Sequence, residues 1–184
     1  MRRKIAPRRL VETALGLLVL LVVAFMRPEG AEPTDGAASQ GTTRFHVTRV
    51  VDGDTVEVAT DDGTRSKVRL IGVDAPESVD PRRPVECFGK EASAKLKELL
   101  EGKPVTLIAD PTQDDKDRYG RLLRYVESED GDAGRALLRQ GYAHEYTYRR
   151  PHARKADYLA AMDAARAAQA GLWAPGACAT EVAQ

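Results

Sequence analysis

Short segments of alternating apolar and polar residues, each ended by a tight turn, constrain the fold of this chain most strongly. Residues 45–51 (FHVTRVV) and 55–60 (TVEVAT) flank an Asp-Gly-Asp turn. A second turn, Asp-Asp-Gly, leads into residues 66–73 (SKVRLIGV). Alternation with a period of two is typical of strands that bury one face. The sequence therefore predicts three short strands in a meander.

The remaining segments alternate between helical and strand patterns. Residues 90–100 have helical periodicity and are followed by Gly102, which is placed to end a helix. Two more strands are expected at 104–110 and 120–128, and two more helices at 132–142 and 153–170. Strands in meander, one helix, more strands and two helices predict an α+β fold with a small barrel of the OB type.

The N-terminal 27 residues form a separate, hydrophobic segment. A basic stretch at 2–9 precedes thirteen uncharged, mostly apolar residues, ALGLLVLLVVAFM, and Arg27 ends the run. This length is short for a membrane-spanning helix and suits the hydrophobic region of a signal peptide, so residues 1–27 are a signal peptide or a signal anchor. The basic flank places the body outside the cytoplasm in both cases. We expect a protein that is secreted or anchored to the membrane by this segment.

Two further segments lie outside the predicted domain, which spans 43–175. Residues 28–42 are rich in Gly, Ala, Pro and acidic residues and predict a flexible linker. Residues 176–184 form a C-terminal tail. Cys87 and Cys178 have neither a Cys-x-x-Cys nor a metal-site spacing, and in an oxidising compartment a disulfide between them is expected. The alternative is two buried free thiols.

The charge is unevenly distributed along the chain. The first 30 residues carry six basic and two acidic side chains, which leaves 22 basic and 26 acidic ones in the remainder, a net charge of −4. This balance excludes a protein that coats nucleic acid through an overall basic surface. Any nucleic-acid site must be a local basic pocket.

Three segments carry side chains suited to phosphate chemistry. Asp54 follows the Asp-Gly-Asp turn, and Asp74 and Glu77 lie where the third strand breaks at Pro76. Carboxylate and carbonyl oxygens at such a break favour a hard cation. The strand arginines are Arg69 and Arg121. Each feature alone is weak, but metal ligands, a base and two arginines together are what phosphodiester hydrolysis requires.

These motifs resemble the staphylococcal nuclease (thermonuclease) family. VDGDTV, RLIGVDAPE, the GKEAS helix start, DRYGR and RQGYA occur in the order and similar spacing of that family, from about residue 43 to 173. The resemblance implies an OB-fold five-stranded barrel with three helices. It also implies a monomeric, Ca²⁺-dependent enzyme that cleaves DNA and RNA and leaves 3′-phosphates.

The family's site residues carry over position by position. The resemblance implies Asp54, Asp74 and the main-chain carbonyl of Ala75 as calcium ligands, where the family has a threonine at the last position. It implies Glu77 as general base and Arg69 and Arg121 as phosphate clamps. The residues matching the aromatic lining of the nucleotide pocket are Tyr119, Tyr146 and Tyr148. Two features depart from the family. The loop at 78–85 differs in length and charge, and Cys87 and Cys178 have no counterpart in the family's single-domain type member, which lacks cysteine.

Other readings stay open at this point. A non-catalytic OB module that binds nucleic acid or protein is the alternative function, although none of the five charged site residues is missing. The basic run at 149–155 (Arg149, Arg150, Arg154, Lys155) is either a solvated helix start or a phosphate-binding surface. The three histidines lack a metal-site spacing and are expected to be structural or exposed.

Overall fold

The structure, a computed structural model, describes residues 44–82 and 84–178. The long strands are β1 (Phe45–Asp52), β2 (Thr55–Thr60), β3 (Arg65–Leu70), β5 (Pro104–Ile108) and β6 (Leu122–Ser128). The helices are α2 (Gly89–Leu100), α3 (Ala133–Arg139) and α4 (Lys155–Ala167). The short elements are β4 (Val73–Asp74), β7 (Gly131–Asp132), β8 (His144–Glu145) and the 3-10 turn η1 (Gly171–Trp173).

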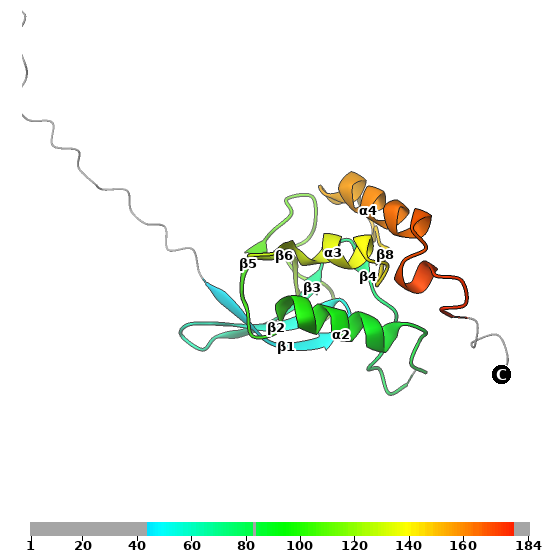
Figure 1. Ribbon diagram of the computed structural model, residues 1–184. Helices are drawn as coiled ribbons and strands as arrows, with labels where there is room; N and C mark the ends of the chain where they lie inside the picture. Colours follow the sequence, from blue (N-terminus) through cyan, green and yellow to red (C-terminus); the bar gives the residue numbers. More distant parts are fainter. Residues whose placement is uncertain (1–43, 83, 179–184) are drawn as a thin grey trace, which may run out of the picture. The chain divides into compact units, whose positions relative to one another are not determined.

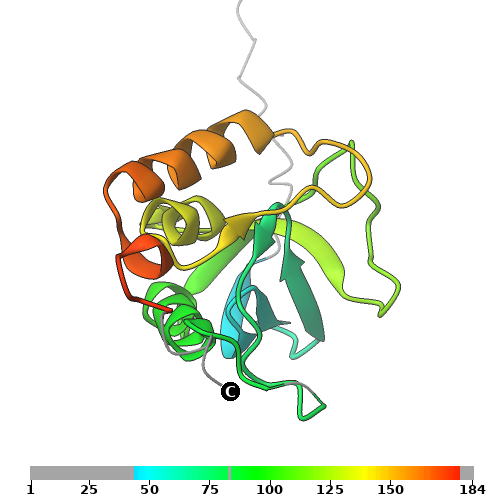
Figure 2. The same cartoon turned by 90° about the vertical axis from the view of Figure 1, so that its right-hand side faces the viewer.

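The five long strands form a closed barrel. Antiparallel pairs join β1 to β2, β2 to β3, β1 to β5 and β5 to β6, and β3 closes the barrel by pairing in parallel with β6. The three helices lie along one side of the barrel (Figures 1 and 2). The predicted five-stranded OB-type barrel with three helices is confirmed.

The core forms where the alternating strand residues meet the helices. Strand side chains on the inner face are fully buried, as are apolar side chains from each of the three helices. The largest buried side chains are Val47, Val56, Val58, Val68, Val73, Leu96, Leu100, Val126, Leu137, Leu138 and Tyr158. Removing this apolar surface from water is the main stabilising contribution to the fold.

The predicted strand at 66–73 is interrupted, and this break positions one site residue. β3 ends at Leu70, and Gly72 has φ +74°, a conformation that favours glycine. A Cβ at Gly72 would lie 2.5 Å from the His152 ring, so the chain passes too close to that ring for a side chain. After the turn, Val73 and Asp74 pair with β8 instead of continuing along the barrel.

The structure tests the predicted disulfide but not the predicted N-terminal segments. The N-terminal hydrophobic helix and the 28–42 linker lie outside the described residues, so they stay predictions. Among the residues that are described, no helix combines the length and hydrophobicity needed to span a bilayer. The structure joins Cys87 and Cys178 in a disulfide with a Cα–Cα distance of 5.6 Å, the pairing that the sequence predicted.

A buried hydrogen-bond network joins the segment after β5, strand β6 and the segment that leads into α4. Asp110 is 5% exposed and accepts hydrogen bonds from the Tyr125 hydroxyl, the Ala153 N–H and both the N–H and hydroxyl of Thr112. Tyr125 also contacts Nδ1 of His152 at 3.0 Å. Burial by itself raises the pKa of Asp110, but the four donors outweigh it and lower the pKa to about 2.

Replacing Asp110 by Asn should destabilise the protein in a pH-dependent way. The pKa falls from 3.8 to about 2, which corresponds to about 2 kcal/mol of folding free energy. Because the folded-state pKa is depressed, this contribution is complete above about pH 4 and is lost as the pH falls toward about 2. Urea denaturation of wild type and Asp110→Asn should therefore differ at neutral pH and converge in acid.

The exposed Asp163 provides the control for this comparison. Its side chain is 66% exposed and forms an ion pair with Arg166 at 3.4 Å. Asp163→Asn should change stability by less than about 0.5 kcal/mol at any pH, as surface pairs do. Equal and pH-independent losses in both variants would contradict the role assigned to Asp110.

Candidate active site

Barrel closure brings two predicted site residues, Asp54 and Arg121, to either side of Arg69. In the β2–β3 ladder Arg69 pairs with Thr55, and in the β3–β6 ladder it pairs with Leu123. Asp54 precedes Thr55 in the chain, and Arg121 lies two residues before Leu123. Arg69 therefore has the Asp-Gly-Asp turn on one side and the start of β6 on the other.

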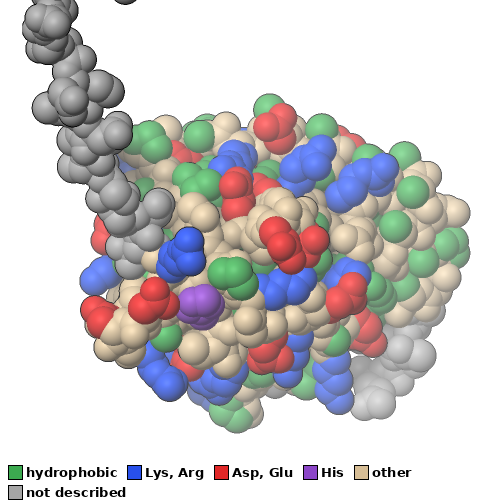
Figure 3. All heavy atoms as spheres, turned by 60° about the vertical axis from the view of Figure 1, so that its left-hand side comes forward, with side chains coloured by type: hydrophobic (Ala, Val, Ile, Leu, Met, Phe, Trp, Pro, Cys, Tyr) green, Lys and Arg blue, Asp and Glu red, His purple; other side chains and the backbone are tan. Residues whose placement is uncertain are grey.

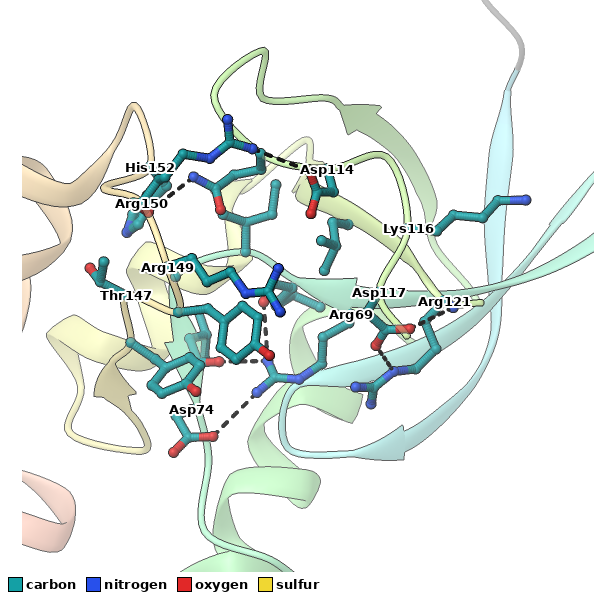
Figure 4. A pocket seen from close by; sticks show the side chains of 18 of the residues that line it. Arg69, Asp74, Asp114, Lys116, Asp117, Arg121, Thr147, Arg149, Arg150 and His152 are labelled. Carbon is teal, nitrogen blue, oxygen red and sulfur yellow. Dashed lines mark hydrogen bonds and ion pairs between the residues drawn. The ribbon is translucent and has the colours of Figure 1, made fainter. Parts of the chain in front are cut away.

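The Arg69 guanidinium lies between two carboxylates. Its Nη2 is 2.9 Å from Asp54 Oδ2 and 3.2 Å from Asp74 Oδ1, and its Nη1 donates to the main-chain carbonyls of Leu70 and Val73. The Arg69 side chain is only 15% exposed. Figure 4 shows its contact with Asp74 at the edge of the pocket. These contacts fix the direction of the guanidinium on a rigid strand.

The two carboxylates differ in environment. The Asp54 side chain is 10% exposed and accepts hydrogen bonds from the Thr55 hydroxyl at 2.9 Å and the Ala75 N–H at 3.3 Å. The Asp74 side chain is 55% exposed. Partial desolvation raises the pKa of Asp74, the Arg69 charge opposes this rise and the Asp54 charge adds to it. The two carboxylates therefore repel each other, and a bound cation would reduce this repulsion.

These residues fit a hard cation held by oxygen atoms. Ala75 follows Asp74 directly and its N–H contacts Asp54, so its main chain lies beside both carboxylates. Within residues 44–82 and 84–178, no group of three or more His, Cys, Asp or Glu side chains is arranged to hold a metal ion. A cation here would depend on two carboxylates, a main-chain carbonyl and water, a donor set suited to Ca²⁺.

Next to Asp54, Asp52 and Glu77 form a second acidic pair, which includes a residue that the sequence reasoning missed. Asp52 Oδ1 accepts hydrogen bonds from the Gly53 N–H at 2.8 Å, the Ser78 hydroxyl at 2.6 Å and the Ser93 hydroxyl at 3.2 Å. Burial raises the pKa of Asp52, and the nearby charges of Asp54 and Glu77 raise it further. The hydrogen bonds from Ser78 and Gly53 lower the pKa but do not offset this rise. Asp52 belongs to the same Asp-Gly-Asp turn as Asp54, which was the available signal.

Glu77 is held by the backbone of its own loop. Its Oε1 accepts hydrogen bonds from the N–H groups of Ser78, Val79 and Asp80 at 2.8–3.0 Å. Burial raises the pKa of Glu77, but these amides and a contact with Asp52 outweigh it and lower the pKa. Glu77 is therefore ionised at neutral pH. It does not line the pocket described below, and neither do Asp54 and Ala75.

Arg121 is oriented by a residue that the sequence reasoning did not single out. Its Nε donates to Asp117 Oδ2 at 2.6 Å, and its Nη1 donates to the Thr55 hydroxyl at 3.3 Å. Asp117 also accepts from the N–H groups of Tyr119 and Arg121, which fixes the turn. Burial raises the pKa of Asp117, but the Arg121 contacts outweigh it and lower the pKa. Asp117 is the first residue of the DRYGR motif, so the motif itself was the sequence feature that could have pointed to it.

A pocket of about 1060 Å³ opens beside these residues. Loops at 113–121 and 146–152 form its walls, and Arg69, Asp74 and Arg121 line it (Figure 4). The three tyrosines singled out in the sequence also line it and are exposed, by 67%, 44% and 63% for Tyr119, Tyr146 and Tyr148. Such exposed rings offer flat surfaces for stacking bases.

Only part of the basic run at 149–155 reaches the pocket. Arg149 and Arg150 line it, with Arg149 5.2 Å from the Tyr148 ring centre and Arg150 3.2 Å from Asp114 (Figure 4). Arg154 instead forms ion pairs with Glu127 and Asp132 at 2.7 and 2.6 Å, on the helical side. The run therefore splits between a pocket wall and a structural contact.

Basic side chains outnumber acidic ones in the lining of this pocket. On the face shown in Figure 3, basic and acidic side chains alternate, and neither sign forms a continuous patch. The pocket, in contrast, is lined by six Arg or Lys and three Asp side chains. This contrast agrees with the slightly acidic body and favours a pocket for an anionic ligand over a broad binding surface.

Comparisons with known proteins agree with this arrangement. Residues 67–175 match the model of a family described as staphylococcal nuclease homologue. The chain is similar to thermonuclease of Staphylococcus hyicus, with 37% identity over 132 residues that cover 72% of this chain and 76% of that protein. Thermonuclease of Staphylococcus intermedius is 37% identical over 71% of this chain and 76% of its own. Endonuclease YncB of Bacillus subtilis is 38% identical over a stretch that covers 52% of this chain and 44% of that protein.

The packing around Gly53 provides a test of how tightly the two acidic loops are joined. A Cβ at Gly53 would lie 2.6 Å from Ala75 Cβ and 2.9 Å from Ala92 Cβ. Gly53→Ala should therefore lower the free energy of unfolding by about 1–3 kcal/mol, as overpacking does, measured by chemical denaturation. Adding Ala75→Gly removes the closer clash and should restore part of the loss. A fully stable Gly53→Ala variant would contradict the close contact between the loops.

Proposed function

The chain belongs to the staphylococcal nuclease family, and from this premise we propose that it is a Ca²⁺-dependent phosphodiesterase that hydrolyses DNA and RNA to 3′-phosphate products. At the coarser level the protein is a nuclease. The observation that carries the proposal is the position of Arg69, fixed between Asp54 and Asp74 at the edge of a pocket that also contains Arg121 and three exposed tyrosines. Metal-binding and phosphate-binding groups are thus adjacent.

The acidic pair supports the choice of cation. Asp54, Asp74 and the Ala75 carbonyl would hold Ca²⁺, which supplies positive charge to polarise a phosphate when it is bound. Both carboxylates already contact one cationic group, Arg69, which indicates that their spacing suits a shared positive charge. The modest number of protein ligands suits an environment where Ca²⁺ is abundant.

The two arginines account for stabilisation of the transition state. A planar guanidinium donates two parallel hydrogen bonds to phosphate oxygens, which a lysine ammonium cannot do. Arg69 and Arg121 reach the pocket from neighbouring strands, and Asp117 and Thr55 hold Arg121 through Nε and Nη1. As negative charge grows on the phosphate oxygens, contacts with these fixed guanidinium groups strengthen.

Glu77 supplies the base. Its carboxylate is ionised at neutral pH, since burial raises its pKa but three backbone N–H groups and the contact with Asp52 outweigh burial and lower it. It takes a proton from a water molecule, whose oxygen attacks phosphorus in line with the 5′-oxygen. The bond between phosphorus and the 5′-oxygen then breaks, the 5′-oxygen takes up a proton from solvent and leaves as a hydroxyl, and the phosphate remains on the 3′ side. General-base catalysis of this kind typically contributes about 10²–10⁴ in rate.

The substrate would extend beyond the cleaved phosphate. Tyr119 stands on one wall of the pocket, and Tyr146 and Tyr148 stand on the other, with ring centres 6.3 Å apart. Bases of any sequence can stack on such rings, which fits cleavage of both DNA and RNA. Arg149 beside Tyr148 would add an electrostatic contact to a neighbouring phosphate.

The alternative is an OB module that binds nucleic acid or protein without cleaving it. Asp54, Asp74 and Arg69 would then form only a structural ion-pair cluster. The enzyme is favoured because the base, both arginines and the acidic pair are all present in one region of the barrel. The residues of a site indicate function more strongly than the fold does.

We also propose that the protein acts outside the cytoplasm as a monomer, secreted or held at the membrane by residues 1–27. The basic and apolar N-terminal sequence supports export. The disulfide Cys87–Cys178 supports an oxidising compartment.

Cleavage should require Ca²⁺. Hydrolysis of single-stranded DNA and of RNA by the purified full chain should fall to background in excess EGTA and return when Ca²⁺ is added in excess over the chelator. Asp54→Asn should raise the Ca²⁺ concentration needed for half-maximal rate. Full activity in chelator would exclude the oxygen-ligand cation from the mechanism.

Glu77→Gln should separate chemistry from binding. The amide cannot take a proton from water, so kcat should fall by about 10²–10⁴ while binding of a labelled oligonucleotide in Ca²⁺ stays within about threefold, less than about 0.7 kcal/mol. Rates come from single-turnover kinetics and binding from fluorescence anisotropy. If wild type bound the oligonucleotide but cleaved no faster than Glu77→Gln, the non-catalytic module would be the better description.

A further inference from the structure

The two ends of the loop between Glu77 and Glu86 are hydrogen-bonded to each other. The Glu86 N–H donates to the Glu77 carbonyl at 2.8 Å, and the Glu77 N–H donates to Glu86 Oε2 at 3.0 Å. Between these residues the chain forms the loop whose first three N–H groups after Glu77 hold the Glu77 carboxylate. The main chain of Glu77 is thus fixed to the segment that leads into α2.

Helix α2 begins directly against this contact. The Gly89 N–H donates to the Glu86 carbonyl at 3.0 Å. A Cβ at Gly89 would lie 2.5 Å from the Glu77 carbonyl oxygen and 3.0 Å from that of Pro76. Any displacement of the helix start toward the loop would therefore move the Glu77 main chain.

The residue between the loop and the helix adopts an unfavourable backbone conformation. Phe88 has φ +70°, in the left-handed region that bulky residues rarely adopt. Such a conformation persists only when surrounding contacts hold it. One contact is the Tyr142 ring, whose centre lies 5.5 Å from that of Phe88. The Phe88 carbonyl also accepts a hydrogen bond from the Ala92 N–H at 2.9 Å, and the preceding residue, Cys87, is held by its disulfide.

The far side of the disulfide is attached to the helical layer. The Leu172 N–H donates to the Gly141 carbonyl at 2.8 Å, and Trp173 packs against the core. A Cβ at Gly141 would lie 2.1 Å from the Ala170 carbonyl, so these segments touch through their main chains. Cys178 lies five residues beyond Trp173 and links this docked segment to Cys87, 91 positions away in sequence.

We propose that the Cys87–Cys178 disulfide is a positioning element for Glu77, which makes the nuclease active in its oxidised form and much less active when reduced. The inference rests on the proposed function. The crosslink holds Cys87, and through it the left-handed Phe88 and the Gly89 contact, against the main chain of Glu77. A chain with reduced thiols retains its barrel, its cation ligands and its pocket, but its base is no longer fixed.

The switch is a two-electron exchange with a dithiol reductant. The sulfur–sulfur bond of the protein breaks and both cysteines take up a proton, while the reductant loses two hydrogens and forms its own disulfide. A newly made chain in a reducing compartment would therefore have low activity before it reaches an oxidising one. Such a delay would protect the nucleic acids of the producing cell.

The test compares the full chain in oxidised form with the same chain reduced by dithiothreitol and alkylated with iodoacetamide. With Ca²⁺ and a labelled oligonucleotide, kcat should fall at least tenfold on reduction while KM changes less than threefold. Circular dichroism should show that the reduced chain stays folded at the assay temperature. Reoxidation of an unalkylated sample should restore kcat. A folded, reduced chain with the oxidised kcat would overturn the proposal.

A Glu77→Gln background distinguishes positioning of the base from general loosening of the structure. Without a base to position, reduction should leave the residual rate of Glu77→Gln unchanged, although its melting temperature should fall as that of wild type does. An equal fractional loss of rate in both backgrounds would overturn the proposal. If the oxidised wild type with Ca²⁺ does not cleave at all, the proposed function itself is wrong, which is a separate outcome.

Gly89→Ala provides a second route that keeps the disulfide intact. The added Cβ presses on the Glu77 carbonyl, so kcat should fall without a change in KM, even if the reduced chain proves too unstable to assay. Ala94→Gly, also in α2 but exposed and away from this contact, is the control for helix destabilisation. A folded Gly89→Ala variant with the kcat of Ala94→Gly would show that Glu77 does not depend on this contact, and would overturn the proposal.

Discussion

The parallel pairing of β3 with β6 is the constraint on which the site depends. It closes the barrel and gives Arg69 a partner on both sides, Thr55 in β2 and Leu123 in β6. Asp54, which precedes Thr55, and Arg121, two residues before Leu123, are thereby brought to either side of Arg69 although they lie far apart in sequence. An open sheet would leave Arg69 in β3 at one edge and Arg121, just before β6, separated from it by three strands.

The carboxylates in this region have different partners. Asp54 and Asp74 contact the Arg69 guanidinium, whereas Asp52 and Glu77 accept hydrogen bonds from serine hydroxyls and backbone amides. Separate donors allow several carboxylates to remain close together, because each hydrogen bond offsets part of the desolvation and mutual repulsion. The same logic fixes Arg121, whose partner Asp117 is itself held by backbone N–H groups.

The disulfide and the glycines at main-chain contacts tie this arrangement to the helical layer. Gly53, Gly72 and Gly89 each stand where a side chain would collide with a neighbouring segment. A small barrel has little apolar area to hold irregular loops. Close main-chain packing and the Cys87–Cys178 crosslink provide the constraint that hydrophobic burial alone would not.

The sequence by itself determined the strand and helix order, because alternation and helical periodicity follow directly from which face each element buries. It also identified the family, and with it the prediction that Asp54, Arg69, Asp74, Glu77 and Arg121 form the site. Only the tertiary structure decided that β3 breaks at Gly72, that Arg154 leaves the basic run to pair with Glu127, and that Asp52 and Asp117 support the site. These outcomes depend on contacts between residues far apart in sequence, and local pattern carries no information about which distant group will be the partner.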